Sequence, residues 1–232
     1  MIEGRNNMVK NQFSKKEEAI FMGHLLGDGH VQKRGKEAYR TKIEHCYAQS
    51  SYVEWKYRQF EDFAINQPKK VISKHNLATS LFYLKSGLYL KKYHDLFYQP
   101  YIWTSKTETT NNKSSKIRYR KTITEQLINQ LPKDPVLMAV WYMDDGNRRS
   151  DCFSGRLATQ SFSKEEHHLL QAYILEAFSI KTAIVLHSAI NKSYYLSIPA
   201  KKNNFANFVD LVQPVITEVP CMQHKIKRPR ND

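Results

Sequence analysis

Two apolar stretches of the chain share one pattern, in which a run of hydrophobic positions ends at an acidic residue that is followed by glycine. The first reads FMGHLLGDG over Phe21–Gly29, and the second reads MAVWYMDDG over Met138–Gly146. The run Val136–Met143 contains no charged residue, which is typical of a helix that is buried on all sides. Asp28 and Asp145 lie 117 positions apart, about half of the 232-residue chain. The pattern therefore predicts one structural unit that the chain uses twice.

The positions of these two acids predict a metal site. A helix C-terminus carries partial negative charge, so a carboxylate there is unfavourable unless a cation lies nearby. If the two helices pack side by side, the carboxylates of Asp28 and Asp145 come together, and like charges at short range cannot both stay ionised unaided. A shared divalent metal ion would resolve this conflict, between two halves of one molecule.

Glycines support the pairing of the two helices. Gly23 and Gly27 are four residues apart, so they share one helix face and would let a second backbone approach closely. The motif glycines Gly29 and Gly146 suit the left-handed residue that commonly ends a helix. Both features predict a helix–helix interface at the centre of the molecule.

Hydrophobic periodicity predicts the same order of elements in each half. In the first half we expect a helix over 15–28, a hairpin over 31–45 with its turn at 33–36, a helix over 52–65, strands over 71–73 and 80–90, and a helix over 91–97. In the second half we expect a helix over 134–145, a strand over 156–161, a helix over 164–178, strands over 182–187 and 193–198, and a helix over 200–212. Ser163 and Glu166 have the spacing of a helix capping box.

Composition points to a polyanionic partner. The chain has 36 Lys and Arg against 22 Asp and Glu, a formal charge of +14, and a pI near 9.6. Lysine and arginine contacts to phosphate would dominate affinity for nucleic acid and make it sensitive to salt. No run of 18 apolar residues occurs, so we expect no membrane association. Cys46, Cys152 and Cys221 form neither a zinc pattern nor a disulfide framework, so we expect reduced thiols in an intracellular compartment, either a bacterial cytoplasm or an organelle.

The two apolar stretches resemble the LAGLIDADG motif of homing endonucleases, in the single-chain form that carries two copies. The resemblance runs from about Glu17 to Pro229 and is most characteristic at the YMDDG ending of the second copy. It implies an α+β fold of two pseudo-symmetric αββαββα halves, with antiparallel sheets that form a DNA-binding saddle and motif helices packed at the central interface. It also implies cleavage of both strands of double-stranded DNA at a long, rare target, by an intron-encoded enzyme that uses Mg²⁺ (or Mn²⁺).

The repeat predicts how the chain is divided. Residues 8–103 would form the first half, 104–117 a linker or loop rich in Thr, Asn, Ser and Lys, and 118–232 a segment that includes the second half. The opening MIEGR matches a protease-recognition sequence of the kind placed ahead of expressed proteins, so we expect residues 1–7 to be a leader. Because both motif copies lie in one chain, we expect a monomer.

The resemblance assigns roles to individual residues. Asp28 and Asp145 would coordinate metal together with the backbone carbonyls of Gly27 and Asp144, while the Asp144 side chain would simply be solvated. Lys121 and Lys225 follow the motif acids by 93 and 80 positions and would enter the catalytic pocket. There they would stabilise transition-state charge or polarise the attacking water. Three further polar residues are nominated to position water near each site: Gln160, Cys46 and Ser50.

The strands carry the prediction of DNA contact. Along Tyr39–His45 the alternation places Arg40, Lys42 and Glu44 on one face, and a curved antiparallel ribbon can read base edges in the major groove. The full set of candidate DNA-binding residues is Gln32, Lys33, Arg34, Arg40, Lys42, Glu44, Lys74, Tyr83, Lys85, Arg148, Arg149, Gln160, Lys192 and Tyr194.

Two other classes of function remain open. The same fold occurs in RNA-binding intron maturases and in non-catalytic DNA-binding regulators. Regulators lose one or both motif acids, whereas Asp28 and Asp145 are both present here. A maturase can keep both acids, so intron RNA remains a possible partner. A phosphate-binding structural protein would not need duplicated helices that end in acids.

Overall fold

Each half of the chain folds as a helix, two strands, a helix, two strands and a helix. The computed structural model describes residues 11–104 and 115–228. The first half contains α1 (Lys15–Leu26), β1 (Val31–Lys33), β2 (Tyr39–Cys46), α2 (Ser50–Gln59), β3 (Lys69–Ile72), β4 (Ala78–Tyr83) and α3 (Lys91–Phe97). The second contains α5 (Pro135–Asp145), β7 (Gly146–Arg148), β8 (Gly155–Leu157), α6 (Lys164–Phe178), β9 (Ala183–Ser188), β10 (Ser193–Ile198) and α7 (Asn204–Ile216). The predicted pair of αββαββα halves is confirmed.

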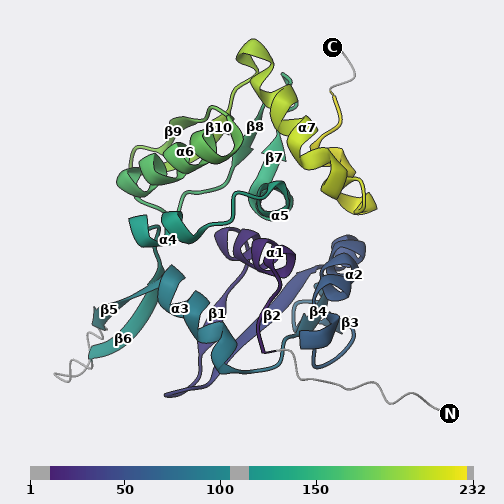
Figure 1. Ribbon diagram of the computed structural model, residues 1–232, viewed down its shortest axis with the longest axis vertical. Coiled ribbons are helices and arrows are strands. Elements are labelled where there is room, and N and C mark those ends of the chain that lie inside the picture. The colour runs from purple at the N-terminus through teal and green to yellow at the C-terminus, as the bar shows by residue number, and fades with distance from the viewer. Residues whose placement is uncertain (1–10, 105–114, 229–232) are drawn as a thin grey trace.

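The two sheets have the same topology. The strand orders are β1-β2-β4-β3 and β7-β8-β10-β9, and every pair of neighbours is antiparallel. In the first half α2 packs on β2 and β4, and in the second half α6 packs on β9 and β10. Figure 1 shows the two halves on opposite sides of the central helices α1 and α5. The two halves therefore share one architecture, as expected of one unit used twice.

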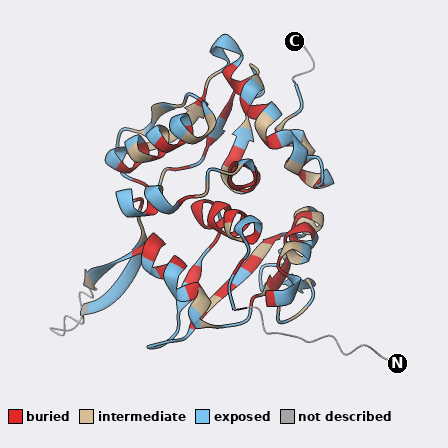
Figure 2. Ribbon diagram, viewed as in Figure 1, coloured by how far each residue is buried: buried red, intermediate tan, exposed pale blue. Residues whose placement is uncertain are grey.

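The helices α1 and α5 form the interface between the halves, and Figure 2 shows most of each helix as buried. A Cβ atom added at Gly23 would lie 2.5 Å from the backbone oxygen of Leu137, and one at Gly27 would lie 2.5 Å from Asp144 Cβ. The predicted close approach of the two backbones is therefore confirmed. The expectation of left-handed motif glycines is wrong, because no described glycine has a positive φ. Gly146 instead leaves space for the ring of Tyr142, which would overlap a Cβ atom at that position.

Local capping explains where the principal helices begin. Ser14 and Glu17 form a capping box at α1, and Ser163 and Glu166 form the predicted one at α6. At α5 the Asp134 side chain accepts a hydrogen bond from the Val136 amide, with Pro135 in the first turn. These caps set the register at which the motif helices present their acids.

The segment between the halves contains elements that the sequence pattern did not predict. β5 (Tyr98–Thr104) and β6 (Ser115–Lys121) pair as an antiparallel hairpin, followed by α4 (Glu125–Gln130). The ends of the predicted linker, Thr104 and 115–117, are therefore strand residues, while its centre lies outside the described residues. The predicted leader also lies outside them, and the domain boundaries stay a prediction.

Other elements differ from expectation mainly at their ends. α2 stops at Gln59, β4 stops at Tyr83, and α7 runs through Pro214 to Ile216. The short strand β7 was missed because it has only three residues and begins directly at the motif glycine. Five 3-10 segments complete the described chain: Tyr47–Gln49, Glu61–Phe63, Leu88–Leu90, Lys201–Asn203 and Pro220–Lys225. Within the described residues, no helix has the length and apolar character needed to cross a membrane.

Candidate active site

The two motif acids emerge at the ends of the central helices. Asp28 follows the last turn of α1, and Asp145 is the last residue of α5. Burial, followed by the negative charge of Asp144, raises the pKa of Asp28. Burial and the charges of Asp28 and Asp144 raise the pKa of Asp145 to about 7. The electrostatic conflict that the sequence predicts is therefore present in the fold, and a bound cation would relieve it.

Both predicted lysines lie at these helix ends. Lys121, the last residue of β6, donates from Nζ to the carbonyl of Gly27 over 2.9 Å. Lys225 donates from Nζ to the carbonyls of Met143, at 2.5 Å, and Tyr142, at 3.3 Å. Burial lowers the pKa of both groups, to about 8 for Lys121. Each lysine thus neutralises carbonyl charge where a helix ends, one beside each acid.

Asp144 is buried instead of solvated, so that expectation is wrong. Its side chain has no exposed surface and accepts hydrogen bonds from Lys56 Nζ and Tyr52 Oη at 2.8 Å each, and its second oxygen lies 2.8 Å from His24 Nδ1. Burial is the largest single influence and opposes ionisation of this carboxyl, but the charge of Lys56 and the interactions with His24 and His45 together outweigh it and hold the pKa of Asp144 well below its usual range. Asp144 is therefore a structural carboxylate, because both of its oxygen atoms contact side chains of the first half.

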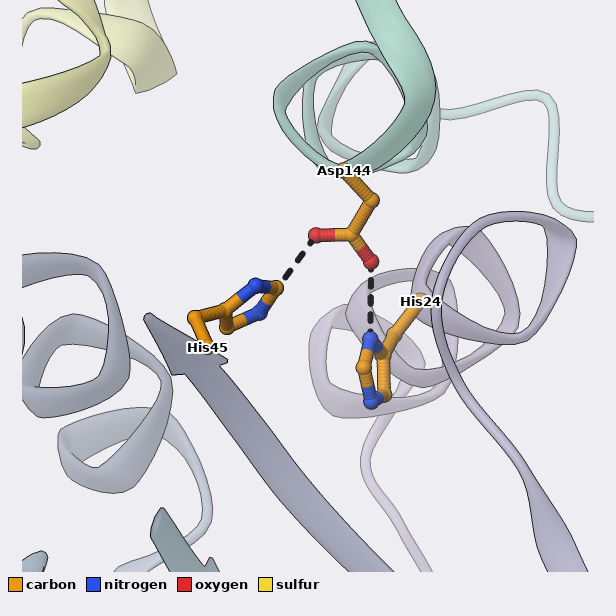
Figure 3. Close-up of side chains that lie close together, drawn as sticks. All are labelled: His24, His45 and Asp144. Carbon is orange, nitrogen blue, oxygen red and sulfur yellow. Dashed lines mark hydrogen bonds and ion pairs between the residues drawn. The ribbon is translucent and has the colours of Figure 1, made fainter. Parts of the chain in front are cut away.

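Two histidines lie beside Asp144, and Figure 3 shows both rings directed toward its carboxylate. Ligand atoms of His24, His45 and Asp144 lie within 4.8 Å of one another, which is close enough to hold a metal ion. The ammonium group of Lys56 already lies among them, 3.0 Å from His24 Nδ1 and 3.0 Å from His45 Nε2. Burial and the Lys56 charge lower the pKa of the histidines to about 4 and about 3, so both rings are neutral. A lysine cation occupies the place that a metal would take.

The candidate DNA-binding residues divide between several positions. In the first half, Gln32, Arg40, Lys42 and Glu44 line one hollow with Asp28, and Arg40 stacks on the Tyr83 ring at 4.8 Å. In the second half, Arg148 and Arg149 line another hollow with Asn147, Arg156 and Tyr195, three residues that the sequence prediction did not include. The remaining candidates lie at strand ends or in the segments between elements: Lys33, Arg34, Lys74, Lys85, Gln160 and Lys192. Among these, the Lys85 side chain donates to the Asp62 carbonyl.

Tyr194 lies on the other face of its sheet from these hollows. Its ring faces His167 of α6, whereas the neighbouring Tyr195 faces Arg156. Among the residues nominated to position water, Cys46 ends β2, Ser50 begins α2, and Gln160 lies between β8 and α6. All three cysteines are free.

Comparison with known proteins decides the family. The LAGLIDADG DNA endonuclease family matches residues 18–205, which is most of the chain and includes both motif helices. The chain belongs to this family. As a LAGLIDADG protein it carries two diverged copies of the motif, and the central helices, paired acids and twin sheets described above are the family's fold.

The chain is also similar to a solved structure and to curated proteins over most of its length. The homing endonuclease I-WcaI, solved bound to its DNA recognition sequence, has a TM-score of 0.72 and 23% identity, covering 94% of this chain and 88% of that one. Among curated proteins, RecA of Mycobacterium gastri is 24% identical over 92% of this LAGLIDADG chain and 47% of its own length. The cytochrome b mRNA maturase bI2 of Saccharomyces cerevisiae is 25% identical over 90% of this chain and 46% of its own. The chain thus spans about half the length of the curated relatives it matches.

Proposed function

We propose that this protein is a homing endonuclease that hydrolyses one phosphodiester bond in each strand of a long, rare DNA target with the help of divalent metal. The observation that carries the proposal is the pair of acids at the ends of two packed helices, each with a raised pKa. Such a pair has a clear use in phosphodiester hydrolysis and no evident structural benefit. Family membership supports the same activity.

The residues present fit a hard divalent cation such as Mg²⁺ or Mn²⁺. The available ligands are carboxylate oxygens of Asp28 and Asp145 and the carbonyl oxygens of Gly27 and Asp144, which are the donor types that Mg²⁺ prefers. The Asp144 carboxylate is committed to Lys56 and contributes no ligand. When bound, the metal would supply Lewis-acid stabilisation of the charge that develops on the phosphate and its leaving oxygen.

Lys121 and Lys225 are the cations that this chain itself would bring to the reacting phosphates. Each side chain is held by carbonyl groups at a helix end, so little reorganisation is needed as negative charge develops. Because burial lowers the pKa of both lysines, they also exchange protons more readily than ordinary surface lysines. They would stabilise the transition state or polarise the attacking water, one at each strand.

The outer faces of the two sheets are the proposed DNA-reading surfaces. Arg40, Lys42 and Glu44 alternate with buried residues along β2, so their side chains share one face with Asp28 at its edge. The hairpin of β5 and β6 adds a basic and aromatic surface, where Arg118 stacks 3.8 Å from the Trp103 ring. Interleaved cations and aromatic rings suit contact with phosphates and bases.

Cleavage of genomic DNA tests the proposal directly. Purified protein would be incubated with a library of genomic fragments in Mg²⁺ or in EDTA, and the cut ends captured by ligation and sequenced. We expect a discrete site cut on both strands in Mg²⁺ and no cut in EDTA. Cutting that persists under complete chelation would contradict the metal mechanism, and the absence of any discrete site would contradict the endonuclease proposal.

A second candidate function is the binding of intron RNA, which the similarity to a cytochrome b mRNA maturase favours. Equilibrium binding of the protein to the RNA that surrounds its own coding sequence would test it, with a scrambled RNA of equal length as the control. Equal affinity for both RNAs would leave only nonspecific attraction to a chain of charge +14.

A further inference from the structure

A buried polar network lies directly behind the two motif acids, and the proposed reaction does not use it. Lys56, from α2, is completely buried and donates to Asp144 Oδ1 at 2.8 Å and to His45 Nε2 at 3.0 Å. Nζ also lies 3.0 Å from His24 Nδ1, but that nitrogen donates to Asp144 Oδ2 at 2.8 Å, because a carboxylate can only accept. The third hydrogen of Lys56 is therefore left for the ring of Tyr52, whose centroid lies 4.2 Å from Nζ. These partners fix the orientation of the ammonium group.

This orientation determines which way His45 points its hydrogen. An ammonium group can only donate, so Nε2 of His45 accepts the bond from Lys56. The neutral ring must then carry its hydrogen on Nδ1. That atom lies 3.6 Å from Asp28 Oδ2. The ring is 4% exposed whereas the Asp28 side chain is 47% exposed, so a fixed interior group faces an acid at the surface.

The network exists on one side of the molecule only. The position on α5 that corresponds to His24 of α1 is Trp141, and Asp144 corresponds to Gly27. The charged groups that act most strongly on Asp145 are Asp28, Asp144, Lys121 and Lys225, and Lys56 is also coupled to it, but no hydrogen bond or ion pair joins Asp145 to a histidine of the described residues. The two motif acids therefore have different supports, although their helices are related by pseudo-symmetry.

We propose that His45, held by Lys56, is a positioning residue for Asp28 alone, and that it aligns one of the two strand-cleavage reactions and not the other. The two atoms are 3.6 Å apart, slightly beyond a hydrogen bond, so the Nδ1 hydrogen of His45 would attract Asp28 Oδ2 electrostatically and favour one orientation of a side chain that solvent would otherwise leave free. Asp145 has no such group and is positioned by the end of α5 itself. This inference rests on the proposed endonuclease function.

Strand-specific cleavage rates test the inference. A duplex carrying the site recovered from the genomic library would be labelled differently on each strand and cut in a single turnover. Wild type cuts both strands if the proposed function is right. His45→Ala should slow one strand by about tenfold to a hundredfold more than the other, which is the scale expected for a misplaced reacting group. His94→Ala removes another buried histidine of the same half, which contacts no motif acid, and should leave the ratio of the two rates unchanged.

Two conservative variants separate positioning from folding. His45→Asn keeps an N–H donor near the position of Nδ1 and should restore the ratio in part. His45→Gln keeps an acceptor near the position of Nε2 for Lys56 but loses the donor toward Asp28, so it should fold well and keep the unequal rates. If the His45 variants slow both strands by the same factor, or slow neither, His45 is only a structural residue and the inference is wrong. If wild type cuts neither strand, the endonuclease proposal fails first, which is a different result.

Discussion

Lys56 Nζ lies 2.8 Å from Asp144 Oδ1, and neither side chain has any exposed surface. The pair joins α2 of the first half to α5 of the second. A carboxylate in such a place depends on its cation, because removing one partner of a buried ion pair leaves a charge without compensation.

Lys56→Met should therefore lower the free energy of unfolding by about 3–5 kcal/mol. Urea denaturation measures this, and Arg58→Met is the matched control, since Arg58 is exposed on the same helix and should change stability by no more than about 0.5 kcal/mol. The double variant Lys56→Met/Asp144→Asn should lose less than the sum of the two single losses. Equal effects of Lys56→Met and Arg58→Met would contradict the role given to the pair.

Asp28→Asn and Asp145→Asn should each abolish double-strand cutting while duplex binding stays largely intact. Each substitution removes one metal-binding charge and makes the protein more positive, which does not weaken attraction to phosphate. Single-turnover cleavage and equilibrium binding on the same duplex measure the two properties separately. A large loss of affinity in either variant would show that the acids act in binding and not in hydrolysis.

Lys121→Ala and Lys225→Ala should slow cleavage with little change in affinity, since each removes one cation among 36 basic residues but the one beside a motif acid. A thousandfold loss of rate would correspond to roughly 4 kcal/mol of transition-state stabilisation. Lys164→Ala, at the exposed start of α6, is the control and should cut at the wild-type rate. Wild-type rates in the first two variants would show that Lys121 and Lys225 only support the helix ends and take no part in cleavage.

Asp145 should contribute less to the stability of the metal-free protein as pH rises from about 4 to about 7. Burial and neighbouring carboxylates raise its pKa from 3.8 to about 7, so the folded state holds a proton over this window that the unfolded state releases. His24 and His45 act in the opposite direction, because their pKa values are lowered to about 4 and about 3, and below about 6.5 the unfolded state binds protons that the folded state does not. The measurement is therefore the difference in melting temperature between wild type and Asp145→Asn at about pH 5 and about pH 8, with and without Mg²⁺. Wild type should lose stability relative to Asp145→Asn as pH rises, and Mg²⁺ should offset this loss; an equal difference at both pH values would count against the raised pKa.

Gly23→Ala should destabilise the protein by about 1–3 kcal/mol, as overpacking does in a closed interface. The added methyl group would lie 2.5 Å from the Leu137 carbonyl oxygen, so α1 and α5 would have to separate. Gly35→Ala is the control, because nothing lies within 4 Å of the added atom there. If both substitutions have the same effect on thermal unfolding, the helices are not as closely packed as described.

The parts of the fold that could be predicted are those with a local signal. The apolar runs that end at Asp28 and Asp145 have helical length and an unmistakable end, so the two central helices and the repeat were predictable. Lys121 and Lys225, which contact the carbonyls of Gly27 and Met143, were predicted through resemblance to a family and not through any local pattern. Their spacing from the motif acids was consistent with two equivalent halves.

The buried network was missed because its contacts are distant in sequence. Lys56 is 88 residues from Asp144, and His24 is 120 residues from it. A lysine on an amphipathic helix is ordinarily exposed, and only the packing of α2 against the end of α5 makes this one internal. The signal that could have found it is Asp144 itself, a second acid at the end of a helix that is otherwise buried.

Tyr194 was assigned to the wrong face although the alternation along its own strand was informative. Tyr194, Leu196 and Ile198 lie at alternate positions of β10, and Leu196 and Ile198 are buried. Tyr194 therefore shares the face that packs on α6, and Tyr195 takes the outer position. The irregular pairing between Ser193 and Tyr194 leaves His187 of β9 unpaired and does not change the face of Tyr194.

The contact between Gly27 and Asp144 also constrains the ancestry of the chain. In a dimer of identical subunits, a twofold axis would place either two glycines or two aspartates at this crossing. Two aspartates do not fit, since their Cβ atoms would lie about as close as the 2.5 Å between Asp144 Cβ and the position that a methyl group on Gly27 would take. Two glycines would leave the buried charge of Lys56 without its carboxylate. With this pair in place, neither half could form a symmetric dimer with a copy of itself without losing the packing of this interface.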